Sequence, residues 1–75
     1  MKAYGYTETS DQIIPLTDVA LAITPDAMRE FARFVAYAAS EMERLGSDYD
    51  HVHAKDFSDA WQEHWPDIQL SKAYD

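Results

Sequence analysis

The chain has 75 residues, of which 47% are hydrophobic and 13% aromatic, so it is apolar enough to fold and too apolar for a disordered chain. It has no cysteine, which excludes disulfides and thiolate metal sites. Fourteen acidic against six basic side chains give a net charge of −8, which argues against nucleic acid and anionic membranes, since both bind clustered positive charge. That charge suits a basic protein partner, or it simply keeps the protein soluble.

The length predicts a single domain, 1–75, near the lower limit at which one core sustains a fold. The N-terminus lacks the apolar stretch of a signal peptide, and no run of residues reaches membrane-spanning length. We therefore expect a cytoplasmic protein.

The first two apolar segments predict an antiparallel hairpin. Residues 2–7 alternate and are rich in tyrosine, which favours a strand. Pro15 cannot donate to a ladder and so marks the entrance of the second strand, residues 16–23. The core face of that strand carries its branched side chains: Val19, Leu21 and Ile23.

The two faces of the first strand differ in size. Ala3 and Gly5 are small enough to lie beneath a helix, which leaves Tyr4 and Tyr6 on the opposite face of the sheet. The reverse placement, with both tyrosines in the core, remains open.

Residues 25–45 predict one long amphipathic helix. Thr24 is a good N-cap, Pro25 suits the first helical position, and Gly46 supplies the usual end. Asp26 and Arg44 complement the helix dipole. At about 100° per residue, one stripe faces the core: Met28, Phe31, Ala32, Val35, Ala38, Ala39 and Met42.

Two aromatic residues of this helix lie outside that stripe. Phe34 is at its edge, and Tyr37 is on the far side with the arginines. Core packing does not explain Tyr37, so we expect it to contact a partner.

The chain after Gly46 predicts a polar connection, a short helix and a last strand. The connection contains a short extended piece at 51–54, and Asp56 resembles an N-cap. A short amphipathic helix follows, with core aromatics at i, i+4 and i+8, and Pro66 stops it; these aromatics are Phe57, Trp61 and Trp65. Residues 67–72 alternate again.

The predicted fold class is α+β with the order β-β-α-α-β. We expect a small, mostly antiparallel three-stranded sheet with one long and one short helix on one face. The other face of the sheet is then open, with Tyr4 and Tyr6 on it.

The sequence shows no reaction centre. There is no phosphate-cradling glycine loop or nucleophile elbow, and no carboxylate lies in an apolar stretch. We therefore expect a protein that is not an enzyme and needs no cofactor. His51 and His53 form the most metal-like pair, but two ligands fall short of the three or four that zinc needs, and surface histidines explain them more simply.

Negative charge gathers in residues 47–67, which hold six acidic side chains against one lysine. Tyr49, Trp61 and Trp65 are interleaved with them. Carboxylates around aromatic anchors suit an interface for a basic protein, because the charges steer association and the rings supply buried area. Core packing explains the two tryptophans somewhat better, and Tyr49 is the aromatic residue we expect to be exposed.

Five stretches together resemble a group of small bacterial proteins classed as immunity proteins of polymorphic toxin systems: MKAYGYT, a hydrophobic second strand, TPDAMREFARFVAYAASEMERLG, HVHAKDF and PDIQL. The resemblance covers nearly the whole chain. It implies a protein that neutralises a cognate toxin, often a nuclease, by binding it tightly, with no catalytic residues.

The sequence therefore predicts a protein-binding module, most specifically an immunity-type inhibitor with a basic partner such as a cognate toxin. The residues expected to meet the partner are Asp48, Tyr49, Asp50, Asp56, Asp59, Glu63 and Tyr37. One alternative is a self-associating protein that forms a homodimer through Tyr4 and Tyr6. The other is a metal-binding module that uses His51 and His53.

Overall fold

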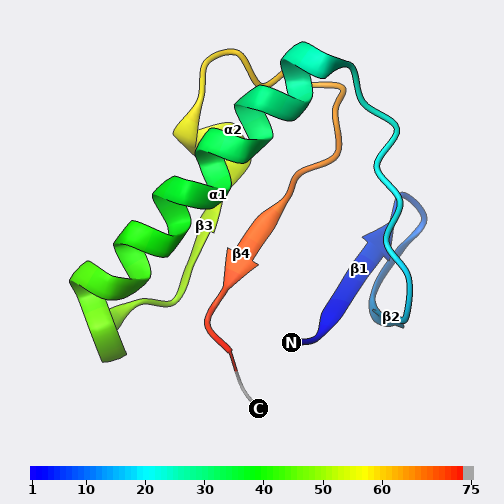
Figure 1. Ribbon diagram of the computed structural model, residues 1–75. Coiled ribbons are helices and arrows are strands. Elements are labelled where there is room, and N and C mark those ends of the chain that lie inside the picture. The colour runs from blue at the N-terminus through cyan, green and yellow to red at the C-terminus, as the bar shows by residue number, and fades with distance from the viewer. Residues whose placement is uncertain (74–75) are drawn as a thin grey trace.

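The computed structural model describes residues 1–73. Their elements follow the order β1 (Ala3–Thr7), β2 (Ser10–Leu16), α1 (Pro25–Leu45), the 3-10 turn η1 (Gly46–Asp48), β3 (His51–His53), α2 (Ala54–Phe57) and β4 (Gln69–Ser71). The α+β class is therefore confirmed, but the order is β-β-α-β-α-β rather than β-β-α-α-β, because His51–His53 pairs with β4 as a strand between the two helices. Instead of one three-stranded sheet, the described residues contain two separate two-stranded antiparallel sheets, β1–β2 and β3–β4 (Figure 1).

Helix α1 has the ends that the sequence predicts. The Thr24 hydroxyl accepts a hydrogen bond from the backbone N–H of Ala27 at 3.2 Å, and Pro25 is the first helical residue. Gly46 ends the helix at φ 55° and ψ −125°, and its N–H donates to the Met42 carbonyl. Because these signals are local, they determine where the helix begins and ends.

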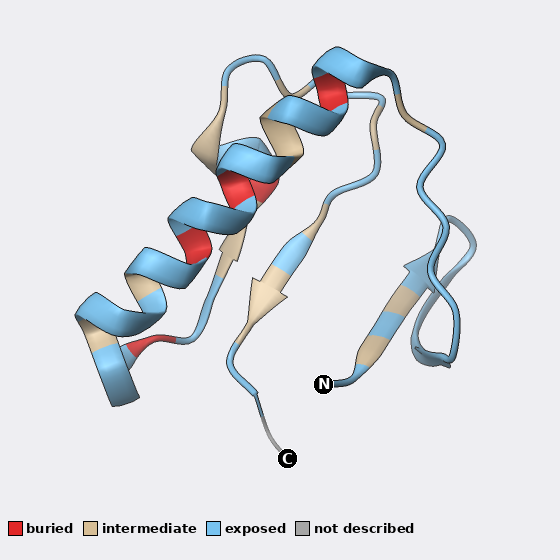
Figure 2. Cartoon of the chain, viewed as in Figure 1, coloured by how far each residue is buried: buried red, intermediate tan, exposed pale blue. Residues whose placement is uncertain are grey.

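The core face of α1 overlaps the expected stripe only in part: Ala38 is buried and Phe31 half-buried as predicted, but the rest of the stripe is exposed. Phe34 is fully buried, whereas Val35, at the centre of the predicted stripe, is 42% exposed. The buried positions of the helix are Ala27, Phe34 and Ala38, and the predicted core residues Met28, Ala32, Ala39 and Met42 are exposed (Figure 2). At about 100° per residue, the buried face is rotated by roughly 80–100° from the stripe that the pattern favours.

Helix α2 packs against this buried face of α1. The Phe57 ring lies 5.7 Å from the Phe34 ring and 4.9 Å from the Tyr37 ring, measured between centroids. Tyr37 therefore joins the aromatic cluster and remains 38% exposed, so core packing explains it in part, contrary to expectation. Its hydroxyl donates to Glu41 at 3.2 Å.

Strands β3 and β4 pair on either side of α2 and the loop that follows it. Residues 51–54 were expected to include an extended piece, and β3 confirms it by pairing His51 with Ser71 and His53 with Gln69. Two backbone hydrogen bonds extend this pairing, from Ala54 N–H to the Ile68 carbonyl at 2.9 Å and from Lys72 N–H to the Asp50 carbonyl at 2.8 Å. The stems of the segment between the two strands are thus held together.

The N-terminal hairpin differs from the expected one. Its second strand is Ser10–Leu16 rather than 16–23, and Pro15 lies within it, opposite Tyr4. A two-stranded ribbon has only edge strands, which tolerate a proline whose missing N–H faces outward. Residues 17–24 contain no strand and connect the hairpin to α1 (Figure 1).

The hairpin does not lie beneath the helix. Within residues 1–73, β1 and β2 pack substantially only against each other, so Ala3 and Gly5 do not support α1. Leu16 covers Gly5 instead: a Cβ added there would meet the Leu16 Cδ1 atom at 3.5 Å. Tyr4 and Tyr6 are exposed on the other face of the ribbon, so neither enters the core.

Candidate functional site

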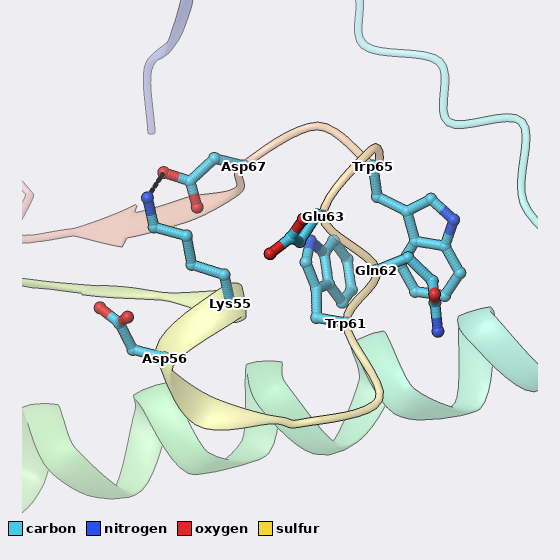
Figure 3. A pocket seen from close by; sticks show the side chains of 7 residues that line it. All are labelled: Lys55, Asp56, Trp61, Gln62, Glu63, Trp65 and Asp67. Carbon is cyan, nitrogen blue, oxygen red and sulfur yellow. Dashed lines mark ion pairs between the residues drawn. The ribbon is translucent and has the colours of Figure 1, made fainter.

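Residues 47–67 form what we call the acidic segment. A hollow of about 390 Å³ lies in this segment, beside α2 (Figure 3). Two tryptophans, three carboxylates, one lysine and one amide surround it: Trp61, Trp65, Asp56, Glu63, Asp67, Lys55 and Gln62. All seven side chains come from residues 55–67, so the hollow belongs to one continuous segment.

Turns rather than a helix shape this segment. A helix with Asp56 as N-cap was predicted to run to Trp65, but α2 begins before Asp56 and ends at Phe57. The Ser58 hydroxyl accepts from the Ala60 N–H at 3.1 Å, and such local bonding competes with a helix. Pro66 adds to this, because the residue before a proline is disfavoured in helical conformation.

The tryptophan rings form one wall of the hollow. Their centroids are 5.1 Å apart and the rings are nearly perpendicular, at 89°, which is a favourable edge-to-face arrangement. The Trp61 indole N–H donates to the Pro66 carbonyl at 3.1 Å and so holds the ring against the loop. Both tryptophans are half-buried, so part of each ring remains accessible.

Charge in the hollow is mainly negative. Three carboxylates face one ammonium group, and that group, Lys55 Nζ, is already 3.8 Å from Asp67 Oδ2 (Figure 3). The same Asp67 oxygen lies 2.8 Å from His53 Nδ1. Asp56 and Glu63 are exposed. A hollow with aromatic walls and carboxylates nearby is suited to a cationic side chain, which gains from both ring faces and opposite charge.

The structure brings only some of the expected partner-binding residues together. Asp56 and Glu63 line the hollow, whereas Asp48, Asp50 and Asp59 are exposed elsewhere on the surface. Lys55, Gln62 and Asp67 line it without having been singled out for partner binding. Ser58 and Pro66, which enforce the turns, were the signals in the sequence that could have indicated this arrangement.

Tyr49 was expected to be exposed, and this expectation is wrong. The side chain is 3% exposed, and its hydroxyl donates to the Leu70 carbonyl of β4. Burial, followed by the nearby Tyr37, Asp50 and Glu41, raises the pKa of the Tyr49 phenol above its ordinary value. Tyr49 therefore fastens the start of the acidic segment to the sheet and presents little surface to a partner.

The two histidines of β3 are neighbours with separate carboxylate partners. Their ring centroids are 4.9 Å apart, and Nδ1 of His51 lies 2.6 Å from Asp50 Oδ2. Within residues 1–73, no three histidine or carboxylate side chains are gathered as ligands for a metal ion. Each imidazole is thus held by one carboxylate, and a third ligand is not placed beside the pair.

No helix of the described residues has the length and apolar character needed to cross a bilayer. Comparison of the chain with protein-family models, curated proteins and solved structures found no match.

Proposed function

We propose that this protein acts by binding another protein, and that the hollow between α2 and the tryptophans receives a lysine or arginine side chain of that partner. The observation that supports this is that two half-buried indoles line the same hollow as the carboxylates of Asp56, Glu63 and Asp67. Rings provide buried area and a cation–π surface, and carboxylates provide attraction at longer range.

The most specific form of the proposal is an immunity-type inhibitor of a bacterial toxin. The net charge of −8 supports it, because a toxin that cleaves nucleic acid needs a basic surface for its substrate. The resemblance in sequence points in the same direction. In this form the chain covers the toxin's basic surface and performs no chemistry itself.

The two tryptophans make the binding step directly measurable. Trp61 and Trp65 are the only tryptophans of the chain, and both line the hollow. Titration with a nona-arginine peptide should therefore change the tryptophan emission, whereas a nona-glutamate peptide should not. Raising the salt concentration should weaken the response, since exposed charges are screened.

A matched pair of variants tests the position of the site. Asp56→Asn with Glu63→Gln should lower the affinity for nona-arginine about tenfold, as expected when two partly exposed ion pairs are lost. Asp48→Asn with Asp50→Asn removes the same charge away from the hollow and should have a much smaller effect. Equal losses in both variants would show that only the overall charge matters.

The inhibitor role needs a test in cells. A toxin gene is expected directly upstream of the gene for this protein, and co-expression should restore growth of cells that make the toxin. Growth that remains arrested, with both proteins present and folded, would refute the inhibitor role. The arginine-peptide result would stand independently.

A further inference from the structure

The surface of this chain is too large for a compact protein of its mass. A compact monomer of 8.6 kDa exposes about 4,700 Å², whereas this chain exposes 6288 Å², an excess of roughly 1,600 Å². The radius of gyration agrees: it is 13.1 Å, against about 11.3 Å for a compact domain of this length.

Two uncovered apolar surfaces contribute to this excess. The first, which we call the helix stripe, comprises the residues of α1 on the side next to the buried face: Met28, Ala32, Val35, Ala39 and Met42. Met28, Val35 and Met42 are 38–54% exposed. A shallow hollow of about 230 Å³ opens on the stripe between Pro25, Met28, Arg29 and Ala32.

The second surface is the N-terminal hairpin with the chain that follows it. Tyr4, Tyr6 and Ile13 are 47–58% exposed, and Val19 and Leu21 continue the apolar surface toward α1. The hairpin packs substantially against no other described element, so its strands are held only by each other (Figure 2). A lone two-stranded ribbon is marginally stable in water, and exposed apolar patches of this extent mark interaction sites.

We propose that a second copy of this chain covers both surfaces, with the hairpin of each copy lying along the helix stripe of the other. Each chain carries both surfaces, so a two-fold axis can bring the hairpin of each copy onto the helix stripe of the other at the same time and close the dimer. A dimer that removed the excess from both chains would bury about 3,200 Å² in total, within the roughly 2,000–5,000 Å² of obligate homodimers.

Charge supports the same pairing. The hairpin and its connection carry Glu8, Asp11 and Asp18 against Lys2. On the other surface, Arg29 lies beside Met28 and Ala32 at the shallow hollow of the helix stripe. Arg29 pairs with Asp26 of its own helix, and both side chains are exposed, which leaves Arg29 able to meet acidic groups of a second chain.

Sedimentation equilibrium of the wild-type chain tests the proposal. We expect a mass of twice 8.6 kDa at micromolar concentration. Ile13→Glu on the hairpin and Val35→Glu on the helix stripe should each raise the dimer dissociation constant about 100-fold or more, because each buries a carboxylate twice per dimer. Gln12→Glu and Ser40→Glu add the same charge to the same elements at polar exposed positions and should leave the dimer intact.

A wild-type mass of one chain throughout would overturn the proposal, and so would a dimer that survives either Ile13→Glu or Val35→Glu. The contact itself is tested with cysteines, since the chain has none of its own. In an equimolar mixture of Tyr6→Cys and Val35→Cys chains, a bismaleimide reagent should join mainly unlike chains. Products formed only between like chains would overturn the hairpin-to-helix arrangement.

Discussion

Replacement of Phe34 by alanine should remove a large share of the stability of this protein. Phe34 is the largest side chain that is fully buried, and its ring meets Phe31 and Phe57 at centroid distances of 6.5 and 5.7 Å. A buried Phe→Ala change costs about 3–5 kcal/mol. A chain of this length has a free energy of unfolding of roughly 4–11 kcal/mol, so the loss is a large share of the total.

Urea unfolding followed by tryptophan emission measures this loss, because both tryptophans lie in the folded segment 55–67 that forms the hollow beside α2. The neighbouring change Val35→Ala is the control, since Val35 is 42% exposed. Val35→Ala should lower the free energy of unfolding by less than about 1 kcal/mol. If a second chain covers Val35, this loss should grow with protein concentration. A loss below about 1 kcal/mol for Phe34→Ala, or a larger one for Val35→Ala in dilute solution, would refute the assignment of the core face.

Two further predictions concern single residues. Gly46→Ala should lower the free energy of unfolding by about 1–3 kcal/mol through backbone strain alone, because no atom lies within 4 Å of the added Cβ; Gly5→Ala, at ordinary φ, is the control in the same urea assay and should be nearly neutral. Tyr49→Phe should reduce the loss of stability at alkaline pH, measured by thermal unfolding from pH 8 to about 11. Burial raises the pKa of the Tyr49 phenol in the folded protein. The contribution of Tyr49 to the free energy of unfolding is therefore complete below about pH 10 and is lost as the pH rises through the folded-state pKa. Tyr4 is exposed, and the control Tyr4→Phe should behave as wild type.

The sequence predicted those parts of the fold that depend on neighbouring residues. Thr24, Pro25 and Gly46 act within one helical turn, so both ends of α1 could be predicted. The choice of its buried face could not, because apolar residues cover more than half of the helix circumference. Phe34 becomes the centre of the core only because Phe57, more than twenty positions later, lies against it.

Prediction of the candidate site was limited in the same way. The excess of carboxylates in residues 47–67 is visible in the composition, and Asp56 and Glu63 do line the hollow. Which aromatic residues remain accessible depends on turns and on contacts with β4. Tyr49 looked like an exposed residue in a polar loop, yet a hydrogen bond to Leu70 and burial beside the sheet remove it from the surface.

Because His53 pairs with Gln69, residues 54–68 form a loop whose two ends are held together by the β3–β4 ladder. The ends of this loop are held by the ladder, so its length and sequence can change at a small entropic cost, about 0.6 kcal/mol for each doubling of length. The core around Phe34 depends on this loop mainly through Ala54 and Phe57, at its first turn. Residues 58–68 are therefore the part of this region that best tolerates replacement, and new recognition loops could be grafted there while α1, α2, β3 and β4 are kept.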